Sequence, residues 1–275
     1  MRHRTLILAG AMLACAAPAL AAPGPADWRT PDADDVLVID TSRGRVIVEL
    51  VPEVAPGHVA RLKDLARKGT YDGRTFFRVI DRFMAQTGDP QDTGEGGADL
   101  PDLKAEFTFR RAADTPLVIA ASPWGTEEGF LKSLPVVSQA MSWSEMTADR
   151  KVAAWGSYCP GVVGMARGDN PDSANSQFFL MRQPYMSLDK RYTAFGRVIS
   201  GLEAIRAIKT GEPVAAPQDR MDRVRVLADI PASERPTVRV IDPVGPWFKG
   251  EIERLRNEKG ADFSLCDVNI PVKVQ

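Results

Sequence analysis

The sequence predicts a mostly β protein that folds as a closed β-barrel. Short runs of β-branched and aromatic residues alternate with Gly- and Asp-containing turns, and only two segments of the main body have convincing helical periodicity. Strands and helices do not alternate as they do around a parallel sheet. The chain has 275 residues, of which 44 % are hydrophobic and 26 % charged, which is ordinary for a globular protein and enough to bury a sizeable core.

Residues 1–21 are expected to be a secretory signal peptide. They combine a short basic start, an apolar run and a small-x-small cleavage pattern that ends at Ala21. A lipoprotein signal with a lipidated Cys15 is the weaker alternative, because a leucine stands one place too close to that cysteine. We therefore expect an exported protein, with the bacterial periplasm as its destination and without a stable membrane span.

The first elements of the fold follow a polar, Pro-containing linker at residues 22–35. Two β-branched runs flank a turn that contains Gly44, which predicts a hairpin over 36–50. A helix is predicted over 54–68, because apolar residues recur at helical spacing and a lysine and a glycine end the pattern. The barrel is expected to extend from this hairpin to residue 230.

The next elements are two short strands and a long irregular region. Strands are predicted over 75–80 and 83–86, and a Gly- and Asp-rich loop follows. From 110 to 158, short apolar stretches are interrupted by Pro, Gly and Ser. We expect this insertion, 110–158, to be an elaborated loop with a few short elements.

The remaining barrel elements are predicted from their apolar patterns: strands over 161–166, 176–181 and 193–199, a short helix over 202–209 and a last strand over 223–227. Residues 231–275 carry proline, charge and one helical candidate, so we expect them to form a C-terminal extension.

The residue inventory excludes several classes of function. After removal of the signal peptide one histidine remains, His58, which is expected to be a surface or packing residue rather than part of a catalytic triad. The cysteines and this histidine lack zinc-ligand spacing, and the glycine-rich 93–97 lacks a nucleotide-binding pattern. We expect no metal, no cofactor and, without a basic patch, no nucleic-acid partner.

Two cysteines remain in the mature chain, Cys159 and Cys266. They either form a disulfide that joins the C-terminal extension to the body or stay separate thiols. The even number in an exported protein slightly favours the disulfide.

Aromatic residues, an arginine and glutamines concentrate in two segments, 76–89 and 165–179. Strand alternation predicts that Phe76, Arg78 and Ile80 share one face. Considered alone, these residues are most simply core aromatics and a solvated charge.

The same segments resemble cyclophilins. The chain carries F-x-R-V-I-x-x-F-M-x-Q-x-G-D at 76–89, M-A-R followed by S-A-N-S-Q-F-F within 165–179, and L-D-x-x-Y-T-x-F-G-R-V at 188–198. The order and the length of the match, about residues 36 to 230, are typical of the family. The resemblance implies an eight-stranded antiparallel barrel capped by two helices, with peptidyl-prolyl cis/trans isomerase activity.

The resemblance also implies roles for individual residues. Arg78 corresponds to the catalytic arginine, and Gln86 to the hydrogen-bonding amide beside it. The matching proline pocket is lined by Phe83, Met84, Phe179, Leu188 and Tyr192. The matching peptide groove next to it is lined by Gly94, Ala166, Arg167 and Gln177.

The chain departs from the family pattern at several of these places. Tyr192 and Phe77 stand where histidines are frequent, and Arg167 stands where asparagine is frequent. Ser187 replaces a tryptophan that is tied to cyclosporin binding, so we expect this inhibitor to bind poorly. The insertion lies between two groove segments in the sequence, where it is expected to cover or extend the cleft.

Two hypotheses follow. The first is an isomerase that acts on X-Pro bonds of unfolded or flexible exported polypeptides and assists their folding. The second is a proline-peptide binding or chaperone module, in which the insertion and the extension carry the main function and turnover is small.

Overall fold

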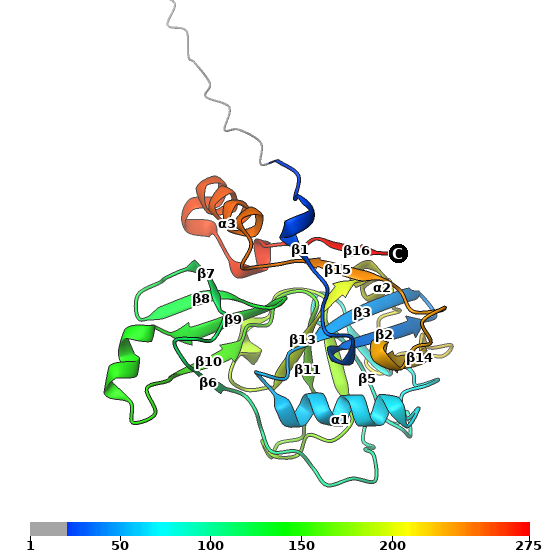
Figure 1. Cartoon of the computed structure of the whole chain (residues 1–275). Helices are drawn as coiled ribbons and strands as arrows, with labels where there is room; N and C mark the ends of the chain where they lie inside the picture. The colour runs from blue at the N-terminus through cyan, green and yellow to red at the C-terminus, as the bar shows by residue number, and fades with distance from the viewer. Residues whose placement is uncertain (1–20) are drawn as a thin grey trace, which may run out of the picture.

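A computed structural model describes residues 21–275, and its centre is one curled antiparallel sheet of eight strands (Figure 1). Their order across the sheet is β14 (Met221–Val226), β2 (Val36–Thr41), β3 (Gly44–Leu50), β13 (Ala194–Ser200), β11 (Val162–Met165), β12 (Phe178–Met181), β5 (Met84–Thr87) and β4 (Arg78–Ile80). Two helices pack against it, α1 (Pro56–Arg67) and α2 (Leu202–Arg206). The prediction of a mostly β fold with few helices is confirmed.

The sheet is curled but is not a closed barrel. Its edge strands β4 and β14 do not pair with each other, and the seam beside them is crossed by isolated bridges, Thr75 to Arg220 and Val79 to Gly211, and by a few further backbone hydrogen bonds. The segment 212–220 precedes β14 and contains Pro213 and Pro217, which have no N–H to donate to a ladder.

Both faces of the sheet are covered by apolar side chains. In β2, Leu37 and Ile39 face an inner cluster with α1, while Val36 and Val38 face an outer cluster. The outer cluster also contains residues of the insertion and of the C-terminal extension, such as Phe130. The uninterrupted apolar run at the start of the fold follows from this burial on two sides.

The insertion is a sheet rather than a loop, so the prediction of an elaborated loop was wrong. Five antiparallel strands lie in the order β6 (Phe109–Arg111), β10 (Val152–Gly156), β9 (Leu134–Gln139), β8 (Thr126–Leu131) and β7 (Val118–Ala121). Alternate residues of these strands, such as Val118 and Ala120, are buried against the outer face of the main sheet. The strands are short, and all of them except β6 adjoin a Gly or Ser, which concealed the alternation in the sequence.

Segments near the two ends of the described chain meet in a separate three-stranded sheet. Its order is β1 (Trp28–Arg29), β15 (Val238–Ile241) and β16 (Val272–Val274), and α3 (Pro246–Lys259) lies between the last two strands in the chain. Residues 22–35 therefore contribute a strand to the fold and are not a free linker. Arg29 reinforces this arrangement through a bidentate ion pair with the buried Glu49 of β3, at 2.5 and 2.8 Å.

A disulfide joins Cys159, which is buried just before β11, to Cys266 of the C-terminal extension. The expected signal peptide lies outside the described residues except for Ala21. Within the described part of the chain, no helix is long and apolar enough to cross a membrane, and no group of three or more His, Cys, Asp or Glu side chains is arranged to hold a metal ion.

The disulfide predicts a measurable contribution to stability. It links residues 107 positions apart, so it removes many conformations from the unfolded chain. Replacing both cysteines by serine is expected to lower the free energy of unfolding by about 2–4 kcal/mol. Urea denaturation of the oxidised wild type and the double variant measures the difference, and equal values would contradict the prediction.

Candidate active site

Strand register brings the predicted catalytic residues into one row on the outer face of the sheet. Arg78 of β4 is the partner of Gln86 on β5, and Gln86 is the partner of Phe179 on β12. Residues paired across neighbouring strands project from the same face, so these three side chains are adjacent. The row continues to Gly164 on β11, where an added Cβ would lie 2.6 Å from the Phe179 ring. The glycine therefore leaves the space that this ring occupies.

Phe76 does not share this face, contrary to the strand alternation predicted from the sequence. It is fully buried in the inner cluster together with Val79, while Ile80 packs against the outer cluster. Strand β4 begins only at Arg78, so the alternation does not extend back to Phe76.

Two adjoining cavities lie beside this row. Together they are lined by every residue for which the sequence predicted a role in catalysis or peptide binding. The first has a volume of about 210 Å³ and is lined by Arg78, Phe83, Met84, Gln86, Ala166, Arg167, Phe179, Leu188 and Tyr192. The second has a volume of about 270 Å³ and is lined by Gln86, Gly94, Glu95, Gly96, Ala166, Arg167, Gly168, Ser173, Asn175 and Gln177. His58 lines neither cavity: it is buried, with Nδ1 2.6 Å from Glu106 Oε2.

A chain of hydrogen bonds connects the two cavities. Arg78 Nη1 donates to Gln86 Oε1 at 3.2 Å, and Gln86 Nε2 donates to Gln177 Oε1 at 2.9 Å. Gln177 Nε2 in turn donates to the backbone carbonyls of Gly94 and Gly96. The chain fixes the orientation of both amides, and each amide group still has donor or acceptor capacity for a bound peptide.

Arg167 forms the boundary between the cavities. Its guanidinium lies 4.6 Å from the centre of the Tyr192 ring and 5.5 Å from that of Phe107, and its Nε donates to the Arg191 carbonyl. Tyr192 also packs edge-on against Phe179. Tyr192 therefore contributes a wall to the first cavity and a stacking surface for Arg167.

A half-buried carboxylate follows directly after Leu188 of the apolar wall. Leu188 is buried at the end of a 3-10 helix (Met186–Leu188), and the next residue, Asp189, accepts hydrogen bonds from the Tyr158 backbone N–H and the Ser157 hydroxyl. Burial raises the pKa of Asp189 to about 6. The neighbouring Ser187 is exposed and does not line the first cavity.

The sequence did not point to Glu212, which forms an ion pair with Arg78 Nε at 2.5 Å. The two residues are 134 positions apart in the chain. They meet because Val79 and Gly211 exchange both backbone hydrogen bonds across the seam of the sheet. No local pattern carries this information.

A comparison with models of protein families identifies the family of this chain. The model for cyclophilin-type peptidyl-prolyl cis-trans isomerases matches residues 36–229, which include both cavities. The chain belongs to the cyclophilin family.

Relatives of this cyclophilin agree with the family assignment. A probable peptidyl-prolyl cis-trans isomerase of Brucella suis is 35 % identical over 191 residues, which are 66 % of this chain and 74 % of the relative. The mouse peptidyl-prolyl cis-trans isomerase-like 1 is 29 % identical over 214 residues, covering 78 % of this chain and 99 % of the mouse protein.

A solved cyclophilin structure from Hirschia baltica superposes with a TM-score of 0.84 at 33 % identity and covers 91 % of this chain and 94 % of its own. This likeness extends beyond the residues that the family model matches, so part of it lies in the terminal segments that the cyclophilin carries outside 36–229.

The ion pair between Glu212 and Arg78 predicts a modest effect on catalysis. Glu212→Gln is expected to lower kcat/KM for a short X-Pro peptide by about twofold to fivefold, because an exposed ion pair contributes only about 0.2–1 kcal/mol to holding the guanidinium in place. Isomerisation assays of Glu212→Gln in the wild-type and in the Arg78→Ala background measure this effect. An equal loss in the two backgrounds would show that Glu212 does not act through Arg78.

The raised pKa of Asp189 predicts a pH dependence of stability. The folded protein keeps the proton on Asp189 up to about pH 6, whereas the unfolded chain loses it near 3.8, so ionisation costs stability as the pH rises between these values. Asp189→Asn removes this cost. The free energy of unfolding of the variant minus that of the wild type is expected to increase from pH 4 to pH 6 and then stay constant. Urea denaturation at pH 4, 5, 6 and 7 tests this, and a constant difference would contradict it.

Proposed function

We propose that this cyclophilin-type peptidyl-prolyl isomerase acts on X-Pro bonds of unfolded or flexible exported polypeptides, with Arg78 as its catalytic residue. One observation carries the proposal: the Arg78 guanidinium lies beside Gln86 in a cavity of about 210 Å³ whose walls include Phe83, Phe179 and Leu188. The apolar walls suit a proline ring, and the charged edge suits the amide next to it.

The chemistry of the reaction explains why such a site is sufficient. Amide resonance opposes rotation about the peptide bond with a barrier of about 18–20 kcal/mol. In the twisted transition state this resonance is lost, so the proline nitrogen regains its lone pair and the amide becomes less polar. A donor beside the nitrogen and an apolar environment both stabilise this state relative to the planar amide.

Arg78 has donors left for this purpose. A guanidinium has five N–H groups, of which one is directed to Glu212 and one to Gln86. Hydrogen bonds from a charged donor contribute about 1.5–3 kcal/mol each. The bonds to Glu212 and Gln86 hold the guanidinium in place before substrate binds, which reduces the cost of orienting it in the transition state.

Gln86 and the second cavity support the orientation of the substrate. One amide hydrogen of Gln86 is directed to Gln177, and the other is available for the carbonyl group of a bound peptide. The second cavity adjoins the first at Gln86, Ala166 and Arg167, so a peptide that places proline in the first cavity can extend into the second.

The insertion and the C-terminal extension do not line either cavity. The expectation that the insertion covers or extends the cleft was therefore wrong: it packs on another part of the outer face. Both cavities stay open to a polypeptide, which favours turnover over the alternative of a binding module with little activity.

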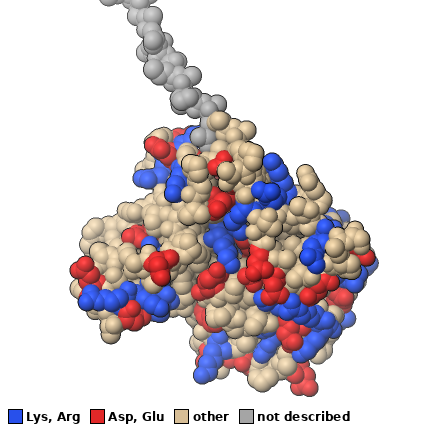
Figure 2. Space-filling model, viewed as in Figure 1, with Lys and Arg blue, Asp and Glu red and all other residues tan. Residues whose placement is uncertain are grey.

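Export and a role in assisting the folding of exported proteins are parts of this proposal. The composition of residues 1–21 supports export, and a disulfide between Cys159 and Cys266 suits an oxidising compartment such as the periplasm. Positive and negative side chains are interspersed on the face shown in Figure 2, which suits polypeptide partners better than nucleic acid. Because Ser187 offers no ring beside the proline cavity, we propose weak cyclosporin binding.

The central prediction concerns Arg78. Arg78→Ala is expected to lower kcat/KM for cis-to-trans isomerisation of a short X-Pro peptide by about 10- to 150-fold, the equivalent of one charge-assisted hydrogen bond. Arg223→Ala, at an exposed position of β14, is the matched control and is expected to keep full activity. If folded wild-type protein shows no rate enhancement, the isomerase proposal fails and the binding-module alternative takes its place.

A further inference from the structure

Arg197 is a buried arginine whose charge no carboxylate balances. It lies on β13 with 9 % of its surface exposed, and within residues 21–275 no acidic oxygen lies within 4 Å of it. Its Nη atoms donate only to two backbone carbonyls, those of Ser133 at 3.2 Å and Val268 at 3.5 Å. Burial without a counter-ion lowers its pKa to about 10.

The nearest candidate for a counter-ion is already engaged. Glu49 is the cross-strand partner of Arg197, so the two residues share the outer face of the sheet. Both Glu49 oxygens are bound by Arg29, and one also accepts the Ser133 N–H. Glu49 is therefore paired with Arg29 and not with Arg197, which leaves the positive charge of Arg197 unbalanced.

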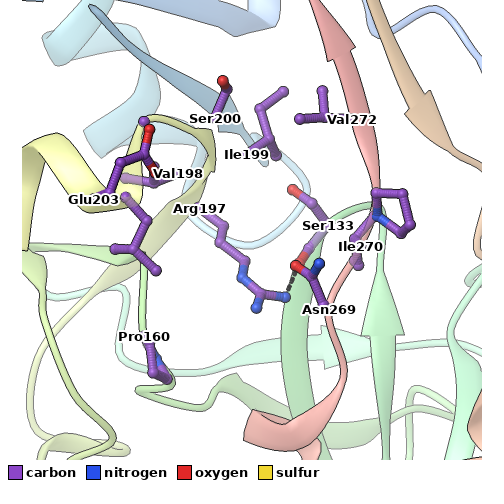
Figure 3. Close-up of a pocket in the computed structure, with 13 residues that line it drawn as sticks. Ser133, Pro160, Arg197, Val198, Ile199, Ser200, Glu203, Asn269, Ile270 and Val272 are labelled. Carbon is purple, nitrogen blue, oxygen red and sulfur yellow. Dashed lines mark hydrogen bonds between the residues drawn. The ribbon is translucent and has the colours of Figure 1, made fainter. Parts of the chain in front are cut away.

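This charge borders a cavity of about 450 Å³ that is separate from the active site (Figure 3). Three parts of the chain build it: β13 and the residues after it, the β8–β9 turn of the insertion with Ser133, and the C-terminal extension from Asn269 to Val272. Figure 3 shows the Arg197 side chain extending between Pro160 and Asn269 towards Ser133. The volume is in the range of small-molecule sites.

A second buried group in the wall also lacks a partner. The Ser133 hydroxyl is fully buried and makes no hydrogen bond within the described residues. Buried hydroxyls are normally satisfied, and leaving one unsatisfied costs stability. An oxygen ligand placed beside Arg197 would complement both groups, because an anionic oxygen accepts from a guanidinium and from a hydroxyl.

Most of the other lining residues are apolar, namely Pro160, Val198, Ile199, Leu202, Ile270, Pro271 and Val272. The exposed Glu203 also lines the cavity and forms no ion pair with Arg197, so its charge disfavours ligands with several negative charges. Ser200 and Asn269 line the cavity as well. The combination of one buried cation, one buried hydroxyl and apolar side chains in part of the wall suits a ligand with a single carboxylate and an apolar body.

We propose that this cavity, which the insertion and the C-terminal extension build on the cyclophilin sheet, binds apolar monocarboxylates through Arg197 and Ser133. The carboxylate accepts from the free guanidinium donors and from the Ser133 hydroxyl, and the apolar part lies against Ile270 and Val272. The ligand is either a small organic acid or the terminal carboxylate of a peptide with an apolar last residue. Binding requires no change in the isomerase site.

The first experiment titrates the full-length mature protein with N-acetyl-leucine and with its neutral amide by calorimetry. The acid is expected to bind with a Kd below about 1 mM, and the amide at least about tenfold more weakly, since it lacks the charge that Arg197 needs. An acetylated tetrapeptide acid that ends in leucine distinguishes the two sources: tighter binding than N-acetyl-leucine identifies a chain end, and weaker binding identifies a small acid. Equal affinity of acid and amide, or binding of inorganic phosphate as tight as that of the acid, would overturn the proposal.

Three variants locate the binding. Arg197→Met keeps the length of the side chain but removes its charge, and it is expected to abolish the preference for the acid while isomerase activity is unchanged. Ser133→Ala removes an unsatisfied hydroxyl and is expected to fold normally. Its affinity for the acid should be about twofold to tenfold lower than that of the wild type. Arg78→Ala must keep full affinity. If Arg78→Ala no longer binds the acid, the ligand occupies the proline cavity and the proposal fails. If Ser133→Ala binds the acid with wild-type affinity, the Ser133 hydroxyl is not a contact of the ligand.

Discussion

Burial of both faces of the curled sheet is the constraint on which the rest of the structure depends. Strand β2 begins with four consecutive buried apolar residues, Val36 to Ile39, which face both sides of the sheet, so a sheet covered only from the inside would expose an apolar surface to water. The insertion sheet and α3 cover much of the outer face, with Phe130 and Phe248 in edge-to-face contact. The part of this face that they leave uncovered is the row of Arg78, Gln86 and Phe179. The active site is thus a segment of the outer face that stays open.

The chemistry of the site depends on strand register more than on any single loop. Arg78, Gln86 and Phe179 come from three strands whose ladder places them side by side, and hydrogen bonds extend this row to Gln177. A shift of one residue in any of these strands would turn the side chains to the inner face. Glu212, which lies outside these strands, holds the Arg78 guanidinium in position before a substrate binds.

The segments outside the family's common range have a structural role and create a new surface. The extension pairs with the chain start, is joined to the body by the disulfide, and lies beside the β8–β9 turn over β13. Glu49 connects β1, β3 and this turn, since it binds Arg29 and the Ser133 N–H. Because Arg29 takes up this carboxylate, the same contacts that attach these segments leave Arg197 as an unbalanced charge beside a cavity.

The sequence by itself determined the family and the mostly β fold, and it pointed to the residues that line the first cavity, because these depend on local patterns: the spacing of Arg78, Phe83 and Gln86 within one hairpin is readable in a single segment. It named only part of the second cavity, whose other lining residues include Glu95, Ser173 and Asn175. The insertion sheet could not be predicted from the sequence, because its strands are too short to show their alternation. The prediction of a closed barrel was wrong, because closure depends on whether two edge strands pair. Only the tertiary structure decided the pairing of Arg78 with Glu212 and the isolation of Arg197. Both depend on distances between residues far apart in the chain, and a charge has a partner or lacks one only after the whole chain has folded around it.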